Sequence, residues 1–190
     1  MPGRCSGKKG SPRQKRLPDA LSEDQVRHRL SGIRNPVHKT CLAVMYACGL
    51  RISEATALEI GAVDRANQVP RIIGKGDKER LVPLPQPVLD ELGRLWRTHH
   101  NCRWLFPNHQ GDAPLNNRVL SRSFAAAAST AGIQRGVTPH ALRHSDATRL
   151  IGNGVDTRIV QILRGHASIT TTAIDTHLTT PRLAIPSGYA

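Results

Sequence analysis

Aromatic side chains are scarce in this chain of 190 residues, at 3% of the sequence. Proteins that hold single-stranded nucleic acid often stack its bases on aromatic rings, so the scarcity argues against that mode of binding. No apolar run approaches the roughly 20 residues that a membrane-spanning helix requires. The N-terminus also lacks an apolar signal core, because its charges are interspersed with glycine, serine and proline. We therefore predict a soluble, cytoplasmic protein with no membrane partner.

Acidic side chains are also few. The chain has 14 Asp and Glu against 27 Lys and Arg, a formal net charge of +13 at pH 7. An excess of this size predicts a polyanionic partner, with nucleic acid as the first candidate and an acidic membrane surface as the second. Because base stacking is disfavoured, binding should rest on phosphate contacts. Double-stranded DNA fits this profile best.

Cysteines number four and form no C-x-x-C pair. This spacing argues against a zinc site built from cysteines. Cys41 and Cys48 fall within an apolar pattern of helical period, so we expect them to be reduced and structural. No metal or other cofactor is predicted.

The length suits a single globular domain. We expect a basic tail at residues 1–18, the domain at 19–181 and a short C-terminal tail at 182–190. Residues 1–16 carry several Lys and Arg but no acidic residue, and almost nothing apolar. The tail is interpreted either as a solvated arm or as an arm that touches DNA.

Capping signals and periodicity predict an α+β fold, mainly α-helical with a small antiparallel β-hairpin. Ser22 and Gln25 form a capping-box pattern, Pro36 suits a first helical turn, and Gly49 suits a helix end. The predicted elements are a helix after Ser22, a helix from Pro36 to Gly49, a turn capped by Ser53 through Leu58, strands 69–73 and 80–84, helices 85–98 and 116–131, a helix from Thr138-Pro139 to Asn153-Gly154, a helix capped by Asp156 that ends at Arg164-Gly165, and a last helix from Ser168 that ends before Pro181.

Single motifs say little about function. Gly74-Lys75-Gly76 lacks the spacing of a nucleotide-binding phosphate loop and is interpreted as a turn with an exposed lysine. His140, Arg143 and His144 share one helical face. A zinc pair from the two histidines is conceivable, but the following residues supply no acidic third ligand.

Four segments taken together are more specific. GLRISEATAL, IIGKGDKERLVPL, TPHALRHSDATRL and LRGHASITTTAIDTHL resemble, in sequence and order, the signature blocks of the tyrosine recombinases, or phage-type integrases, including Xer-like and integron-like members. The resemblance runs from about Leu21 to Pro181. It implies that family's catalytic-domain fold, and a function in DNA recombination and integration that derives from a mobile genetic element.

The resemblance also assigns site residues. It implies an electrostatic clamp from Arg51 and Arg143, a lysine on a hairpin that protonates the departing oxygen, and two histidines for proton transfer or phosphate binding. The family reaction needs no metal, because a tyrosine attacks the phosphodiester and stores its bond energy in a phosphotyrosyl link. The implied catalytic residues are Arg51, Lys75, His140, Arg143 and His166, and the implied DNA contacts are Arg51, Lys75, Lys78, Arg80 and Arg143.

The nucleophile position departs from the family. It is occupied by Asp175, where members have tyrosine. A carboxylate is repelled by the phosphate that it would attack, and an acyl phosphate would hydrolyse readily. We therefore expect impaired strand cleavage and do not expect Tyr189, which follows Pro181 and Pro186, to replace the nucleophile.

Other departures concern stability and assembly. Asp146 stands where the family usually has an aromatic side chain, so its burial would cost desolvation energy. The helical domain that precedes the catalytic domain in relatives is expected to be absent, and so is a C-terminal element that docks on a neighbouring subunit. Other recombinase subunits are nevertheless possible partners.

Three hypotheses remain open at this level. The chain is an integrase catalytic domain that keeps its phosphate site without cleavage, a non-catalytic DNA-binding regulator that occupies recombination sites, or a decayed integrase fragment without a present role.

Overall fold

A computed structural model describes residues 21–74, 77–130 and 138–165. It is mainly helical with a small antiparallel sheet, which confirms the predicted fold class. The elements are α1 (Glu23–Ser31), α2 (Pro36–Ala47), α3 (Ile52–Thr56), a 3-10 turn η1 (Ile60–Ala62), β1 (Val63–Asp64), β2 (Val69–Ile73), β3 (Glu79–Leu81), α4 (Gln86–His99), α5 (Asn117–Thr130), α6 (His140–Gly152) and α7 (Thr157–Leu163).

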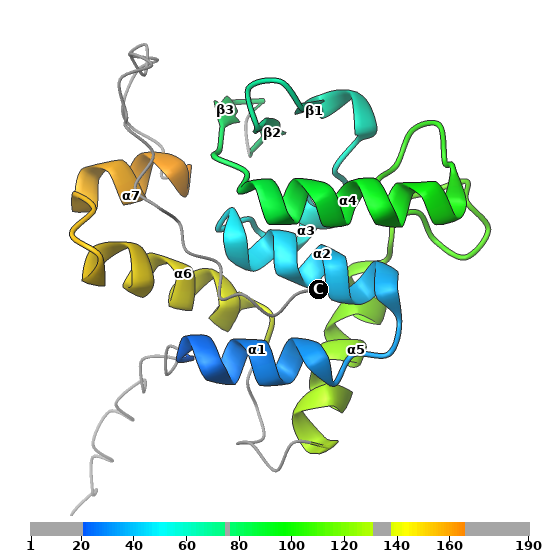
Figure 1. Cartoon of the computed structure of the whole chain (residues 1–190), viewed down its shortest axis with the longest axis horizontal. Coiled ribbons are helices and arrows are strands. Elements are labelled where there is room, and N and C mark those ends of the chain that lie inside the picture. Colours follow the sequence, from blue (N-terminus) through cyan, green and yellow to red (C-terminus); the bar gives the residue numbers. More distant parts are fainter. Residues whose placement is uncertain (1–20, 75–76, 131–137, 166–190) are drawn as a thin grey trace, which may run out of the picture.

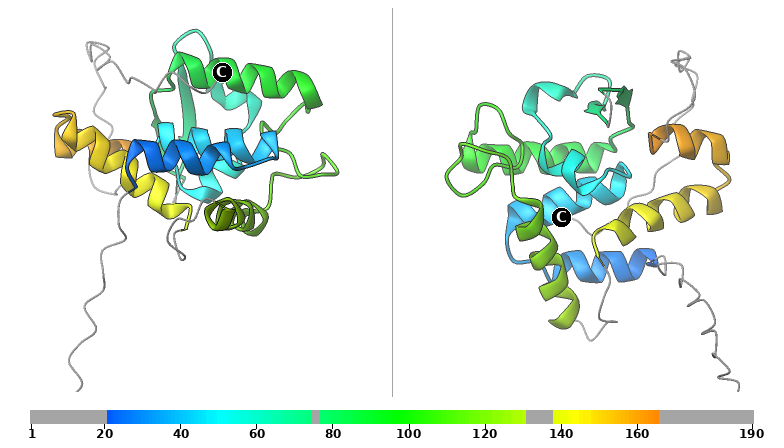
Figure 2. Two further views of the ribbon diagram at one scale, coloured as in Figure 1. Left: turned by 60° about the horizontal axis from the view of Figure 1, so that its bottom comes forward. Right: turned by 180° about the vertical axis from the view of Figure 1, so that it is seen from behind.

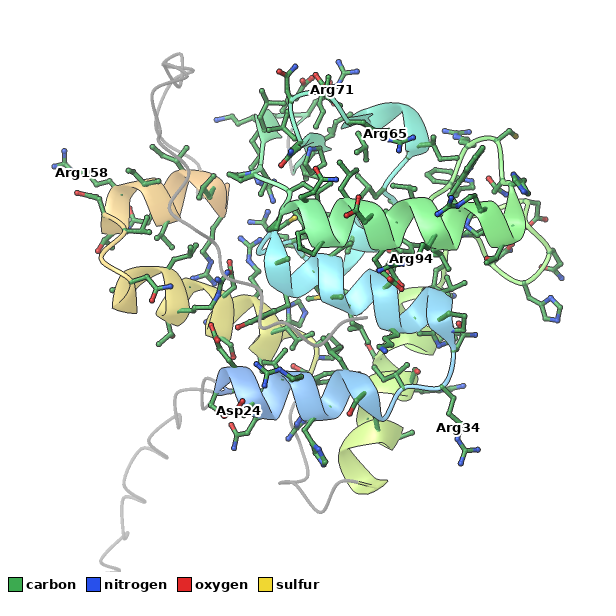
Figure 3. The ribbon with its side chains drawn as sticks, in the orientation of Figure 1. Asp24, Arg34, Arg65, Arg71, Arg94 and Arg158 are labelled. Carbon is green, nitrogen blue, oxygen red and sulfur yellow. The ribbon has the colours of Figure 1, made fainter. Side chains whose placement is uncertain are left out.

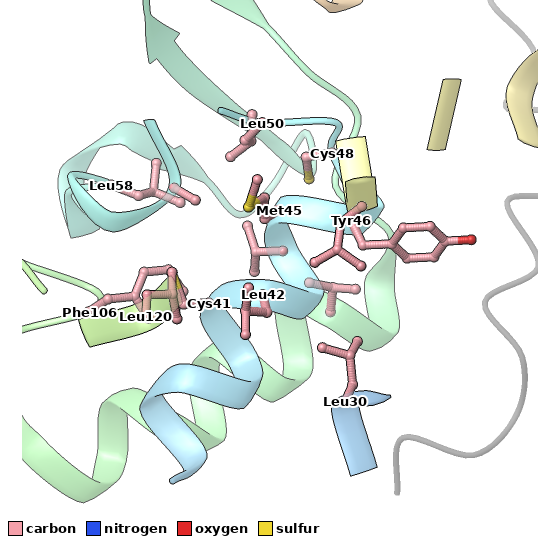
Figure 4. Close-up of a cluster of buried hydrophobic side chains, with 14 of the residues drawn as sticks. Leu30, Cys41, Leu42, Met45, Tyr46, Cys48, Leu50, Leu58, Phe106 and Leu120 are labelled. Atoms are coloured by element: carbon pink, nitrogen blue, oxygen red, sulfur yellow. The ribbon is translucent and has the colours of Figure 1, made fainter. Parts of the chain in front are cut away.

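Helix α2 lies at the centre of the fold and packs against α1, α3, α4 and α6 (Figure 1). Its buried side chains meet those of Leu50, Phe106 and Leu120 in the main core (Figure 4). Cys41 and Cys48 are free thiols buried there, as predicted, and burial raises the pKa of both. The core therefore holds α2 and the turn that follows it in a fixed position.

The helix ends around α2 follow the signals in the sequence. At α1, the Ser22 hydroxyl accepts a hydrogen bond from the Gln25 amide at 3.2 Å, and the Gln25 side chain accepts one from the Ser22 amide at 3.0 Å. Helix α2 begins at Pro36 and is capped at its end by Cys48, after which Gly49 has φ +59°. A positive φ suits glycine because it has no Cβ to clash with the backbone. The chain thereby turns sharply into α3.

The predicted cap of α3 was wrong. Ser53 lies inside the helix, and the cap position is Arg51. The Glu54 carboxylate accepts a hydrogen bond from the Arg51 backbone amide at 2.8 Å, as the third residue of a helix can. This contact fixes Arg51 at the start of α3.

The predicted hairpin is confirmed, and it belongs to a three-stranded antiparallel sheet in the order β1-β2-β3. Its registers pair Val63 with Pro70 and Ile72 with Arg80. Strand β1 is only two residues long, which is too short for an alternating pattern to reveal it. The second hairpin strand is also shorter than predicted, ending at Leu81.

Helices α6 and α7 lie together on one side of the molecule, apart from α4 and the sheet, in all three views (Figures 1 and 2). Helix α6 has no side-chain cap at its start and ends before Gly154, whose φ is +81°. Helix α7 begins as predicted, since the Asp156 side chain accepts a hydrogen bond from the Arg158 amide at 2.6 Å. It ends with Arg164 as its cap and Gly165 at φ +62°.

Several expectations lie outside the described residues, namely the two tails and the last helix from Ser168. The predicted domain boundaries therefore stay predictions. Within the described ranges, no helix combines the length and apolar character needed to cross a membrane.

Candidate functional site

Two of the predicted site arginines, Arg51 and Arg143, meet around a buried glutamate. Arg51 comes from the start of α3 and Arg143 from the first turn of α6. Arg51 Nη1 donates to Glu54 Oε1 at 2.8 Å, and Arg143 Nη1 lies 3.8 Å from Glu54 Oε2. The fold thus brings together two segments that are far apart in the sequence.

Arg143 is held by main-chain acceptors as well. Its Nη1 donates to the Gly49 carbonyl and its Nη2 to the Arg164 carbonyl. The side chain is 7% exposed. Burial, followed by repulsion from Arg51 and Arg164, lowers its pKa to about 10, so Arg143 remains charged at pH 7. Its guanidinium therefore bridges the turn after α2 and the end of α7.

Glu54 organises the arginines. Burial alone would raise its pKa, but hydrogen bonds from Arg80 and Arg51 outweigh that effect and bring the pKa down to about 2. The carboxylate is therefore ionised throughout the physiological range. We call Glu54 with Arg51, Arg80 and Arg143 the arginine cluster.

Arg80 is the most completely paired member of the arginine cluster. Its Nη1 and Nη2 donate to the two Glu54 oxygens at 3.0 and 2.7 Å, and its Nε donates to the Leu163 carbonyl at 2.9 Å. A Cβ on Gly165 would lie 3.2 Å from Arg80 Nη1, so that glycine leaves room for the guanidinium. With its side chain 10% exposed, Arg80 links the hairpin to α7, and DNA contact by this residue stays a prediction.

Two other predicted site residues, His140 and Lys78, are exposed, and so is the neighbouring His144. His140 and His144 lie at the start of α6, and Lys78 lies in the hairpin. Partial burial, together with the charges of Arg164 and Arg143 and the nearby His140, lowers the pKa of His144. The neutral imidazole of His144 is thereby favoured at pH 7. His140 and Lys78 are open to a ligand from solvent.

The remaining predicted site residues are Lys75, His166 and Asp175, and all three lie outside the described residues. Their positions relative to the arginine cluster therefore stay predictions. In the part of the chain that is described, no group of three His, Cys, Asp or Glu side chains could hold a metal ion.

A second carboxylate, that of Asp146, is buried next to the turn at Gly49. Asp146, in α6, is 3% exposed and accepts a hydrogen bond from Arg149 Nη2 at 2.7 Å. Burial raises its pKa to about 6 despite that bond. A Cβ on Gly49 would lie 2.7 Å from Asp146 Oδ2, so the carboxylate packs closely against the turn whose carbonyl holds Arg143.

Sequence reasoning missed Glu54 and the two carbonyl acceptors of Arg143. Glu54 could have been found, because an acid three residues after Arg51 at a helix start is a capping signal. The carbonyls of Gly49 and Arg164 carry no side-chain signal. Only the folded chain reveals them.

Comparison with known proteins gives consistent matches. Residues 19–182 match the model of the phage integrase family. The tyrosine recombinase XerD of Proteus mirabilis is 39% identical over 184 residues, which cover 90% of this chain and 58% of XerD. This chain spans little more than half the length of such relatives.

Solved structures agree with these matches. The crystal structure of XerA recombinase superposes with a TM-score of 0.73 at 29% identity, covering 83% of this chain and 58% of XerA. A post-cleavage complex of the XerH site-specific recombinase with palindromic difH substrate gives a TM-score of 0.69 at 27% identity, covering 78% of this chain and 46% of XerH.

Proposed function

The chain belongs to the phage integrase family, the tyrosine recombinases, and on that premise we propose that it binds double-stranded DNA at recombination sites through a phosphate site built on Arg51 and Arg143. Its fold is that of the tyrosine recombinase catalytic domain. Cleavage is impaired in this proposal, because Asp175 stands at the nucleophile position. The ancestral activity is DNA recombination and integration, in the cytoplasm and in association with a mobile element.

The convergence of Arg51 and Arg143 on Glu54 is the observation that carries this proposal. Arg51 is the more accessible of the two, with 37% of its side chain exposed. A planar guanidinium fits the paired oxygens of a phosphate and stabilises charge that builds on them. Three arginines share the single carboxylate of Glu54, so the arginine cluster is left with a positive charge that a phosphate can neutralise.

The reaction would need groups from beyond the described residues. A tyrosine at position 175 would form a bond from its oxygen to phosphorus, and the bond from phosphorus to the 5′-oxygen would break. Lys75 would supply the proton that this oxygen takes, while His140 and His166 would move the tyrosine proton or hold the phosphate. Rejoining would reverse these steps. The family reaction therefore requires no metal ion and no nucleotide, because the phosphotyrosyl bond keeps the energy of the broken phosphodiester.

Asp175 blocks this sequence at its first step. Near arginines its carboxyl group would stay ionised, and an anion would compete with the DNA phosphate for the clamp. The proposal therefore separates binding, which the arginines support, from cleavage, which the aspartate impairs.

Covalent trapping on a nicked recombination-type duplex tests the proposal. We expect no adduct from the wild-type chain and a protein–DNA adduct from Asp175→Tyr. Asp175→Phe is the matched control, since it adds the ring without the hydroxyl and should give no adduct. Arg51→Gln combined with Asp175→Tyr should lose the adduct while remaining folded by circular dichroism.

The results of the trapping experiment distinguish a site that binds and cleaves DNA from one that only binds it. An adduct with the wild-type chain would show that Asp175 does not prevent cleavage. If folded Asp175→Tyr gives no adduct but Arg51→Gln weakens DNA binding, the site binds phosphate without being competent for cleavage. If neither change has an effect, the proposed phosphate site is wrong.

A second candidate function is regulation, in which the chain occupies recombination sites without cutting them and so blocks an active relative, alone or beside other recombinase subunits. The net charge of +13 and the aspartate at position 175 favour it. It predicts tighter binding to a recombination site than to random duplex of equal length, measured at fixed salt. Equal affinities would exclude this function.

A further inference from the structure

Arg164 lies beside the arginine cluster, although neither the clamp of Arg51 and Arg143 nor the proposed reaction includes its side chain. It caps α7, and its carbonyl accepts the hydrogen bond from Arg143 Nη2. The residues on either side contact Arg80, through the Leu163 carbonyl at 2.9 Å and the close approach of Gly165. The end of α7 is therefore built into the arginine cluster.

The Arg164 side chain adds a further positive charge there. It is partly buried, and its charge lowers the pKa of both Arg143 and His144, while the charge of Arg51 acts on Arg164 in the same direction. Arg143, His144 and Arg51 therefore all lie within electrostatic reach of Arg164. Arg164 thus enlarges the positive charge that surrounds Arg51 and Arg143.

No described carboxylate forms an ion pair with Arg164. Asp146 attracts it electrostatically, but the Asp146 carboxylate is hydrogen-bonded to Arg149 at 2.7 Å. The Nε of Arg164 is enclosed and has no hydrogen-bond partner among the described residues. A buried donor without an acceptor is costly, and so is a guanidinium held near other cations. An anionic ligand would relieve both costs.

We propose that Arg164 is a further phosphate-binding residue, which adds its guanidinium to those of Arg51 and Arg143 when the chain binds duplex DNA. This inference rests on the proposed function, because it extends the same site. In this inference the side chain of Arg164 binds a DNA phosphate, while its backbone carbonyl accepts the hydrogen bond from Arg143. Substitution of the side chain leaves the carbonyl in place, so the two roles can be separated.

The test measures affinity for a random-sequence duplex of about 30 base pairs, since phosphate contacts do not depend on sequence. Arg164→Gln is compared with Arg158→Gln, which removes an equal charge from an exposed residue of the same helix that projects away from the body (Figure 3). Arg51→Gln serves as the reference for the clamp. Dissociation constants are determined at several salt concentrations.

We expect Arg164→Gln to weaken binding about tenfold and to reduce the slope of log affinity against log salt by about 0.9, the value for one lost phosphate contact. Arg158→Gln should change both quantities much less. If Arg164→Gln behaves like Arg158→Gln while Arg51→Gln weakens binding, the inference about Arg164 is overturned and the proposed function stands. If Arg51→Gln and Arg164→Gln both leave binding unchanged, the proposed function fails as well.

A structural role for Arg164 gives a different result. If the side chain only packs beside Asp146, Arg164→Gln lowers the melting temperature but leaves the salt slope unchanged, which overturns the inference. Should that variant not fold, ¹⁵N-arginine spectra of the wild-type chain decide the question, with the Arg164 signal assigned through Arg164→Lys. A shift of the Arg164 Nε signal that saturates with DNA, together with that of Arg51, supports the inference, and an unshifted signal overturns it.

Discussion

Glu54 and Asp146 are two acids with little exposed side chain and opposite ionisation behaviour. Both side chains are 5% exposed, and both are bonded to arginine. The pKa of Glu54 is lowered to about 2, whereas the pKa of Asp146 is raised to about 6. The difference cannot come from burial alone, since burial raises the pKa of both.

The number of hydrogen bonds accounts for much of the difference, and the deeper burial of Asp146 adds to it. Glu54 accepts four hydrogen bonds, two from Arg51 and two from Arg80. Among the described residues, Asp146 accepts a side-chain hydrogen bond from Arg149 alone. Each bond to the charged form favours ionisation, so four outweigh the desolvation cost and one does not. The comparison shows that the first carboxylate supports the arginine cluster as an anion, while the second is close to neutralisation.

The largest effect is expected from Glu54→Ala. This change leaves Arg80 and Arg143 buried without their carboxylate, which typically costs about 3–5 kcal/mol of unfolding free energy. Urea denaturation at pH 7 measures the loss. The matched control is Glu91→Ala, which breaks an exposed pair with Arg94 and should cost about 0–1 kcal/mol. Equal losses in the two variants would mean that Glu54 does not organise the arginine cluster.

The second effect is a pH dependence with opposite sign at the two acids. The pKa of Asp146 lies above its ordinary value of 3.8, so the stability that it contributes is greatest below that value and is lost as the pH rises through about 6. Glu54 behaves in the opposite way, because its stabilisation is complete only above its ordinary value of 4.5 and is lost as the pH falls from there through about 2. Between pH 5 and pH 7 the stabilisation from Glu54 is nearly constant, so of these two acids Asp146 should dominate the dependence there.

Asp146→Asn tests that assignment. The unfolding free energy of the wild-type chain, relative to that of the variant, should fall by roughly 2 kcal/mol between pH 4 and pH 7, because one pKa unit corresponds to about 1.4 kcal/mol and part of the shift acts below pH 4. Asp90→Asn, at an exposed residue of α4, is the control and should keep the wild-type profile. Parallel profiles for wild type and Asp146→Asn would refute the raised pKa.

A smaller effect is expected in the difference between two glycine variants, because the Asp146 carboxylate leaves no space for a side chain at Gly49. Gly49→Ala places a Cβ 2.7 Å from Asp146 Oδ2 in a residue with φ +59°. Gly154→Ala creates similar backbone strain at φ +81°, with nothing within 4 Å of the new Cβ. Strain of this kind costs about 1–2 kcal/mol in each variant, and the clash should add about 1–3 kcal/mol at Gly49 alone.

Thermal melts of the two alanine variants measure this difference. Equal losses of stability would mean that the Asp146 side chain can move aside. In that case the carboxylate would not be held against the turn that carries the Gly49 carbonyl, and the close contact would have no bearing on Arg143.

The sequence predicted most of the fold because its signals are local. The capping box at Ser22 and Gln25, Pro36 at a helix start and Asp156 at a helix cap each act within one helical turn. The cap of α3 was mistaken for Ser53 because serine is a common cap and the carboxylate of Glu54 acts from inside the helix. Strand β1 was missed because two residues are too few to show the alternation of apolar and polar side chains that marks a strand.

The site could be predicted only in part. Family likeness named Arg51 and Arg143, but the atoms that hold Arg143 are carbonyls of Gly49 and Arg164, which any residue would supply. The fourfold bonding of Glu54 depends on Arg80 arriving from β3, a contact between distant segments. The sequence flagged Asp146 as a costly buried acid, and its partner Arg149 could have been found as well, because it follows three residues later in the same predicted helix.

The smallest effect is expected from Glu23→Gln. This change removes the exposed partner of Arg149 and leaves its buried partner, Asp146, in place. Arg149 contacts Asp146 at 2.7 Å and Glu23 at 3.9 Å, and the Glu23 side chain is 43% exposed. Solvent screens the longer, exposed pair, so its loss should cost less than about 0.5 kcal/mol and should leave the pH profile between pH 4 and pH 7 unchanged. Chemical denaturation at pH 4 and pH 7 measures both quantities. A larger cost, or a shifted profile, would mean that Glu23 helps to hold Arg149 in place and thereby affects the ionisation of Asp146. Asp146 would then belong to a network of three residues that joins α1 to α6, and not to a single pair.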